Sequence, residues 1–222
     1  IKKIINKKIN FRYIPQGLDL DFLKDSAKFD ISLLQKFPIK SKLVIGYAGS
    51  MSVSNSLETI IKVAKIIEKS HPEINFYFLG DGMEKKKLIS LSNDLQNVYF
   101  FDKVDKKYVH SFLKKCDVLY DSVNYSKIYD FGISRNKWMD YMYASKPLLI
   151  SYNGFEDIVS KLKNGYIVNS QDIDDLVHKI LKINITKTHE LKSMGAIGKN
   201  YVIKNRTFKT LATNFHKQFN EI

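Results

Sequence analysis

The chain has 222 residues, of which 44% are hydrophobic and 27% are charged, as in ordinary globular proteins with one large domain or two small ones. It carries 36 Lys and Arg residues against 23 Asp and Glu, a net charge of +13, which is compatible with nucleic acid, an anionic membrane surface or a phosphorylated ligand as partner. The single cysteine, Cys116, excludes an internal disulfide, and no apolar run is long enough to cross a bilayer. No helix-turn-helix, RNA-binding aromatic pattern or metal-ligand spacing is visible, so we expect neither a nucleic-acid partner nor a metal.

The chain begins with a segment that we expect to be a linker, residues 1–18, leading into the domain. Within it, residues 11–14 are a candidate strand and residues 15–19, Pro-Gln-Gly-Leu-Asp, a candidate turn. Residues 20–40 mix charges with scattered apolar side chains and are expected to follow the edge of the domain.

From Lys42 onward, short apolar runs alternate with segments of helical periodicity. The pattern predicts strands at 43–48, 74–79, 98–101, 117–120, 147–151 and 166–168. It predicts intervening helices at 56–70, 83–93, 105–115, from about Asn136 to Ser145, 154–162 and 172–182. Such alternation indicates βαβ units, and therefore an α/β fold with a doubly wound, Rossmann-like parallel sheet over residues 1–205.

The tail from Thr188 is predicted to form two helices. The second, within residues 206–222, has an apolar stripe of Phe208, Leu211, Phe215 and Phe219, which needs a partner inside or outside this domain.

The stretch from Asp130 to Pro147 is the first candidate site. A loop with Gly132 and Ser134 leads into a helix, with Asn136 as the expected N-cap, and the start of a helix attracts phosphate. Arg135 and Lys137 flank that start, and Asp140 lies one turn inside. The alternative is a structural helix that buries its apolar residues and leaves these charges in solvent.

Ligands of open parallel sheets bind beyond the carboxyl ends of the strands, so the loop after residues 43–48 is the second candidate site. Gly49 and Ser50 open this loop, and a glycine here either lets the backbone approach a diphosphate or simply makes a turn. No basic residue occurs at 51–56, so any positive charge beside this loop comes from other segments, with Arg135 and Lys137 as candidates.

Several of these segments resemble, in order, the donor site of family 4 glycosyltransferases of the GT-B fold. The resemblance covers about residues 11–205. It rests on residues 47–57, Tyr-Ala-Gly-Ser-Met-Ser-Val-Ser-Asn-Ser-Leu, on Gly-Asp-Gly at 80–82, on Asp-Lys-Val-Asp-Lys at 102–106 and on residues 132–147, which begin Gly-Ile-Ser-Arg-Asn-Lys. The last segment is closest to the subgroup with an Ile-Ser-x-Asn-Lys loop, although Arg135 replaces the usual proline.

The resemblance implies roles for individual residues. Asp140 matches the second acid of the family's Glu-x7-Glu signature and is expected to hold the ribose. Gly132 stands where the first acid is expected in strict register, so Asp130 is its nearest replacement and is assigned, with Arg135 and Lys137, to catalysis. The donor itself, a UDP- or GDP-linked sugar, is expected to contact Gly49, Ser50, Val104, Gly132, Ser134, Asn136 and Asp140.

The function implied is the donor half of a retaining glycosyltransferase that needs no metal or other cofactor. We expect a lipid-linked acceptor, a role in bacterial surface polysaccharide synthesis, and a cytoplasmic location with peripheral contact at the inner face of the membrane. We expect the family's N-terminal acceptor domain to lie outside these residues, residues 206–222 to cross toward it, and the chain to bind donor without transferring sugar. The alternative is a non-catalytic Rossmann-like module that binds an anionic partner such as RNA or lipid head groups.

Overall fold

The structure is a computed structural model that describes residues 14–26, 41–155 and 157–220, with the side chains of 218–220 left out. The candidate strand at 11–14 falls outside this range except for Ile14, which has no regular structure.

The described residues form a six-stranded parallel sheet with strand order β3-β2-β1-β4-β5-β6. This is the doubly wound order, in which β1, β2 and β3 extend the sheet to one side and β4, β5 and β6 extend it to the other. The predicted fold class is therefore confirmed. The strands are β1 (Leu43–Ala48), β2 (Ile74–Leu79), β3 (Val98–Phe101), β4 (Val118–Ser122), β5 (Leu148–Ser151) and β6 (Gly165–Val168).

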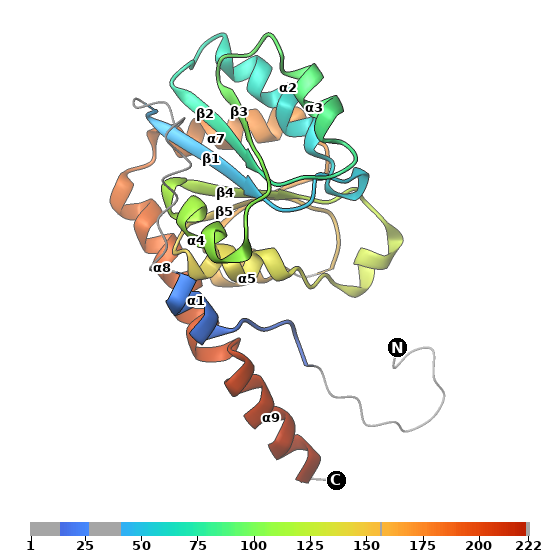
Figure 1. The fold of residues 1–222 in the computed structure, drawn as a ribbon, viewed down its shortest axis with the longest axis vertical. Coiled ribbons are helices and arrows are strands. Elements are labelled where there is room, and N and C mark those ends of the chain that lie inside the picture. The colour runs from blue at the N-terminus through green and yellow to red at the C-terminus, as the bar shows by residue number, and fades with distance from the viewer. Residues whose placement is uncertain (1–13, 27–40, 156, 221–222) are drawn as a thin grey trace.

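Helices cover both faces of the sheet (Figure 1). They are α1 (Leu20–Ser26), α2 (Leu57–Glu68), α3 (Lys85–Leu91), α4 (Lys106–Lys115), α5 (Asn136–Tyr143), α6 (Ile158–Leu162), α7 (Ile173–Ile185), α8 (Thr188–Asn205) and α9 (Phe208–Asn220), with short 3-10 helices η2 (Val53–Asn55) and η3 (Lys127–Phe131). Among the described residues, no helix is both long and apolar enough to span a membrane.

Two apolar clusters explain why the strand sequences are almost uninterruptedly hydrophobic. One face packs against α2, α3 and α7, and the other against α1, α4, α5 and α8. Because both faces are covered, every residue of β1, β2, β4 and β5 is buried.

The predicted strands at 43–48, 74–79 and 98–101 coincide with β1, β2 and β3. The start of α5 differs in one respect. Helical geometry begins at Asn136, and Arg135 occupies the N-cap position without a side-chain capping bond, so Asn136 is not the cap. The short helices α1, η2 and η3 were not predicted, because segments of three to seven residues are too short to show a clear helical periodicity.

The joint between α8 and α9 is held by the segment that leads into the domain. Leu18 and Thr207 form an isolated parallel bridge, with Leu18 N donating to Arg206 O (2.8 Å) and Phe208 N donating to Leu18 O (3.0 Å). From this joint α9 extends away from the body of the domain (Figure 1). Phe208 and Phe215 on the predicted stripe are 56% and 49% exposed.

Candidate functional site

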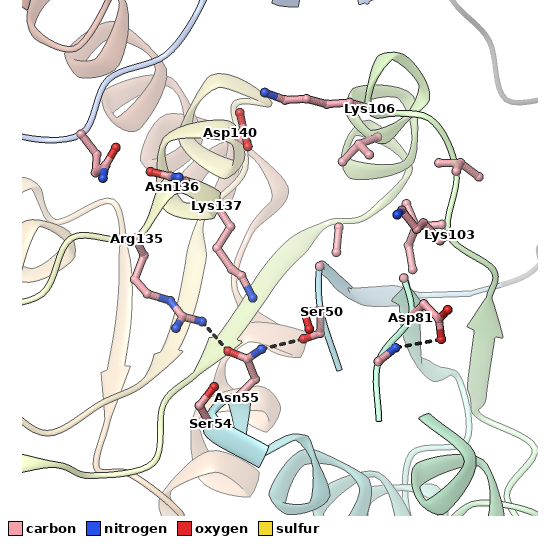
Figure 2. A pocket seen from close by; sticks show the side chains of 18 of the residues that line it. Ser50, Ser54, Asn55, Asp81, Lys103, Lys106, Arg135, Asn136, Lys137 and Asp140 are labelled. Atoms are coloured by element: carbon pink, nitrogen blue, oxygen red, sulfur yellow. Dashed lines mark hydrogen bonds between the residues drawn. The ribbon is translucent and has the colours of Figure 1, made fainter. Parts of the chain in front are cut away.

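A cleft of about 900 Å³ lies at the carboxyl ends of the strands, beside the reversal point between β1 and β4. Its walls are the loops after β1, β2 and β3, the start of α4 and the first turn of α5 (Figure 2). The lining residues are Gln16, Ala48, Gly49, Ser50, Ser54, Asn55, Leu79, Gly80, Asp81, Gly82, Lys103, Val104, Lys106, Val109, Ser134, Arg135, Asn136, Lys137 and Asp140.

Most residues predicted for the site lie together in this cleft. Those that line it are Gly49, Ser50, Val104, Ser134, Arg135, Asn136, Lys137 and Asp140, although they come from segments up to 91 positions apart in the chain.

Asp130 and Gly132 do not line the cleft. Asp130 belongs to η3 and is exposed, where its Oδ1 accepts a hydrogen bond from the Tyr125 hydroxyl (3.5 Å). Gly132 ends η3 with a φ of 110°, and no atom lies within 4 Å of the position that a Cβ would take. The 3-10 turn therefore directs this part of the loop away from the cleft.

The first turn of α5 is anchored to β4 by Asp121, whose side chain is fully buried. Arg135 makes a two-point contact, from Nε to Oδ2 (3.0 Å) and from Nη2 to Oδ1 (2.8 Å). Lys137 Nζ lies 3.1 Å from Oδ1, and the indole Nε1 of Trp138 donates to Oδ2 (2.8 Å). All four groups come from the carboxyl end of β4 and the start of α5.

Lys137 crosses from α5 to the end of β1. Its ammonium donates to the Tyr47 hydroxyl (2.8 Å) and lies 4.2 Å from the centroid of the Tyr47 ring. Nζ is also 3.1 Å from the position that a Cβ on Gly49 would occupy. Burial lowers the pKa of Lys137, and the Asp121 carboxylate opposes that shift.

Asn55 fixes the loop after β1. Its Nδ2 donates to Ser50 O (2.6 Å), while its Oδ1 accepts from Arg135 Nη2 (2.7 Å), as drawn in Figure 2. The hydroxyl of Ser122 in turn donates to Asn55 O. The β1 loop, the end of β4 and the start of α5 are thus one hydrogen-bonded unit.

Asp140 lies one turn into α5, with Lys106 facing it from the start of α4 (Figure 2). Burial raises the pKa of Asp140, and Lys106 partly opposes the shift. A half-buried carboxylate at this position is suited to accept hydrogen bonds from paired hydroxyl groups.

Tight glycine turns bring the ends of β1 and β2 together. Gly80 has a φ of 143°, and a Cβ there would overlap the carbonyl oxygen of Gly49. Gly82 has a φ of 152°, and a Cβ there would overlap the backbone of Met51. Only glycine fits at both positions without strain.

Several site residues were missed from the sequence. Asp121 directly follows the strand predicted at 117–120 and was given no role, and Asn55, Asp81, Lys103 and Lys106 were not singled out, although they lie in the resembling segments 47–57, 80–82 and 102–106. For Asp121, the signal that could have pointed to a site is its position as an acid at the carboxyl end of a buried parallel strand. In the described part of the chain, no group of three or more His, Cys, Asp or Glu side chains is arranged to hold a metal ion.

Residues 32–200 match the family model described as "Glycosyl transferases group 1". A curated relative, the poly(ribitol-phosphate) alpha-N-acetylglucosaminyltransferase of Staphylococcus aureus (strain COL), is 24% identical over 150 residues. The match covers 65% of this chain but only 29% of that relative.

Solved structures share the fold at low sequence identity. A variant of S. aureus TarM, in complex with fondaparinux, alpha-GlcNAc-glycerol and UDP, superposes with a TM-score of 0.68 at 18% identity, covering 81% of this chain and 36% of that one. Anabaena HepE, in complex with UDP and glucose, gives 0.69 at 15% identity, covering 93% and 55%. The C-terminal domain of the Francisella tularensis group 1 protein LpcC gives 0.66 at 16% identity, covering 86% of this chain and all of that domain.

Proposed function

Since the chain belongs to the glycosyl transferases group 1 family, we propose that its cleft binds a nucleotide-diphosphate sugar. We assign the chain to the donor-binding half of a retaining family 4 enzyme, in the subgroup with the Ile-Ser-x-Asn-Lys loop. UDP is the first nucleotide to test, because solved relatives of the same fold are described with UDP bound.

The observation that carries this proposal is the composition of the cleft at the start of α5. Free backbone N–H groups of a helix start, two cations and one carboxylate lie within a single turn and a half. The cations, Arg135 and Lys137, complement a diphosphate, and Asp140 complements ribose hydroxyls.

The same groups have a chemical role when the sugar leaves its nucleotide. Breaking the bond to the anomeric carbon leaves negative charge on the departing diphosphate. Donors that are already in place stabilise that charge without reorganising, which is often the largest contribution of an enzyme to rate. The N–H groups of α5 and the Lys137 ammonium are positioned to act in this way.

We further propose a lipid-linked acceptor, a role in surface polysaccharide synthesis and a peripheral position at the inner face of the membrane. The family resemblance and the excess of positive charge support these assignments. The chain spans less than a third of the curated relative that it matches, so the acceptor and its binding residues are proposed for the whole enzyme.

Calorimetry with UDP, GDP, ADP and uridine tests the donor assignment. We expect one diphosphate to bind in roughly the micromolar to millimolar range. We also expect the Arg135→Ala/Lys137→Ala double variant to lose most of the preference for diphosphate over nucleoside. Lys182→Ala/Lys187→Ala removes the same charge at exposed positions outside the cleft and should change nothing.

A salt-dependent gel shift with random RNA and sedimentation with anionic vesicles test the alternative. Binding of either ligand, together with no binding of any nucleoside diphosphate, would overturn the donor assignment in favour of a non-catalytic module for anionic partners.

A further inference from the structure

The buried carboxylate of Asp121 has its hydrogen-bonding capacity filled by a single short segment. Each of its oxygens has two donors: Oδ1 has Arg135 Nη2 (2.8 Å) and Lys137 Nζ (3.1 Å), and Oδ2 has Arg135 Nε (3.0 Å) and Trp138 Nε1 (2.8 Å). A carboxylate has about four lone-pair sites, so this one has no acceptor site left for a ligand. Asp121 can therefore influence a bound ligand only through its partners Arg135, Lys137 and Trp138.

Both cations that it holds keep N–H donors for a ligand, two on Arg135 and one on Lys137, but they differ in what they contact. Arg135 uses Nε and Nη2 on Asp121 and also donates from Nη2 to Asn55 Oδ1 (2.7 Å). Three of its five N–H donors are therefore committed to the protein, in contacts that join the start of α5 to β4 and to the β1 loop. Arg135 therefore links the start of α5 to both β4 and the β1 loop.

Lys137 lies beside the backbone of the Gly49 loop, which lines the cleft. Two of its three N–H donors go to Asp121 and to the Tyr47 hydroxyl, which leaves one for a ligand. Its ammonium stands against Gly49, 3.1 Å from where a Cβ would be, which is closer than an ordinary van der Waals contact. The β1 loop from Gly49 to Ser56 contains no cation of its own, and Lys137 places one beside it from α5.

We propose that Asp121 is a positioning residue that fixes the Lys137 ammonium against the Gly49 loop, so that Lys137 rather than Arg135 presents the charge to a bound diphosphate. This inference rests on the proposed function.

A competing role makes the opposite prediction. If Asp121 only cancelled charge, the trio Asp121, Arg135 and Lys137 would change from a net +1 to +2 when the carboxylate is replaced by an amide, and anions would bind more tightly. If Asp121 positions the ammonium, the same replacement weakens anion binding. Without the carboxylate, Arg135 and Lys137 repel each other, and the ammonium moves away from the Gly49 loop.

The experiment is a double-mutant cycle on UDP and inorganic pyrophosphate affinity in the full 222-residue chain. Asp121→Asn should weaken UDP binding about ten- to hundred-fold, the range for loss of a charge-assisted hydrogen bond. In the Lys137→Met background, the same substitution should have little further effect, because the group through which it acts is gone. Asp117→Asn is the matched control, since it is the same change at the opposite end of β4, outside the cleft.

Tighter UDP binding in Asp121→Asn, or effects that add fully with Lys137→Met, would overturn the inference. If Asp121→Asn does not fold, Arg135→Gln and Lys137→Met decide the matter, because Arg135→Gln keeps the Asp121–Lys137 pair. Lys137→Met should abolish the preference for UDP over uridine, and Arg135→Gln should weaken it by a smaller factor. An equal or larger loss in Arg135→Gln would contradict the division of roles.

The probes separate the two proposals. If UDP binds no better than pyrophosphate to the unmodified chain, the nucleotide-sugar assignment fails, while the cycle on pyrophosphate still tests Asp121. If neither probe binds, both proposals are overturned.

Discussion

The guanidinium of Arg135, which lines the cleft, and the buried carboxylate of Asp121, 14 residues apart in the chain, form a two-point ion pair. Although burial opposes its charge, the Asp121 carboxylate raises the pKa of Arg135, so the guanidinium stays charged at any physiological pH. Because this pair fixes the start of α5 against β4, Asn136, Lys137 and Asp140 are held in place along the cleft.

Asp140→Ala should weaken the binding of UDP and of uridine by similar factors, about ten- to hundred-fold, because a hydrogen bond to a charged group is lost at the sugar rather than at the phosphates. Calorimetry measures both ligands. Asp174→Ala, an exposed acid in the first turn of α7 outside the cleft, is the control. A loss for UDP with unchanged uridine affinity would place Asp140 at the phosphates instead.

Gly80→Ala should lower the free energy of unfolding by about 1–3 kcal/mol more than Gly132→Ala, as measured by urea titration. Both glycines have a positive φ, 143° and 110°, so both substitutions strain the backbone. Only at Gly80 does the new Cβ also meet an atom, the Gly49 carbonyl oxygen. Gly80→Ala should also weaken UDP binding, because relief of the overlap moves the Gly49 loop. Equal costs at the two positions would refute the close approach of β1 and β2.

The stability of the chain should depend on pH through His110. This histidine is 3% exposed in α4, its Nδ1 has no hydrogen-bond partner, and burial, with Lys114 and Lys199 nearby, lowers its pKa to about 4. An unfolded histidine titrates near 6.5, so between pH 6.5 and about 4 the unfolded state binds more protons than the folded state. The contribution of His110 to the free energy of unfolding is therefore fully present above pH 6.5. It is lost as the pH falls toward 4, by at most about 1.4 kcal/mol per pH unit.

His110→Leu should flatten this part of the pH profile relative to the unmodified chain. His178→Leu makes the same change at an exposed position and should leave the slope intact. Urea titrations from pH 4 to pH 7 give the comparison, and parallel profiles for the unmodified chain and His110→Leu would show that the histidine is not buried as described.

The chain should self-associate through α9. Phe208 and Phe215 are about half exposed on its stripe, and exposed aromatic patches favour association. Phe208→Ser/Phe215→Ser should shift the sedimentation profile toward monomer, whereas Phe155→Ser, at 57% exposure elsewhere on the surface, should not. A chain that is monomeric at high concentration before any substitution would contradict this prediction.

The sequence by itself determined the fold class and the place of the cleft. Apolar runs such as those of β1 and β2 are local patterns, and two buried faces demand them wherever a parallel strand is covered on both sides. The carboxyl ends of such strands meet at one edge, which predicts Gly49 as a site residue, and the start of a helix attracts phosphate, which predicts Arg135, Lys137 and Asp140.

Only the tertiary structure decided which of these residues are joined and which are turned away. A 3-10 turn directs Asp130 outward, and a segment this short leaves no periodic signal in the sequence. Asp121, an isolated acid in an apolar strand, acquires its role from Arg135, Lys137 and Trp138, which reach it only when α5 packs beside β4. Buried charge is tolerated only where partners are supplied, and those partners come from a segment that sequence spacing does not place beside it.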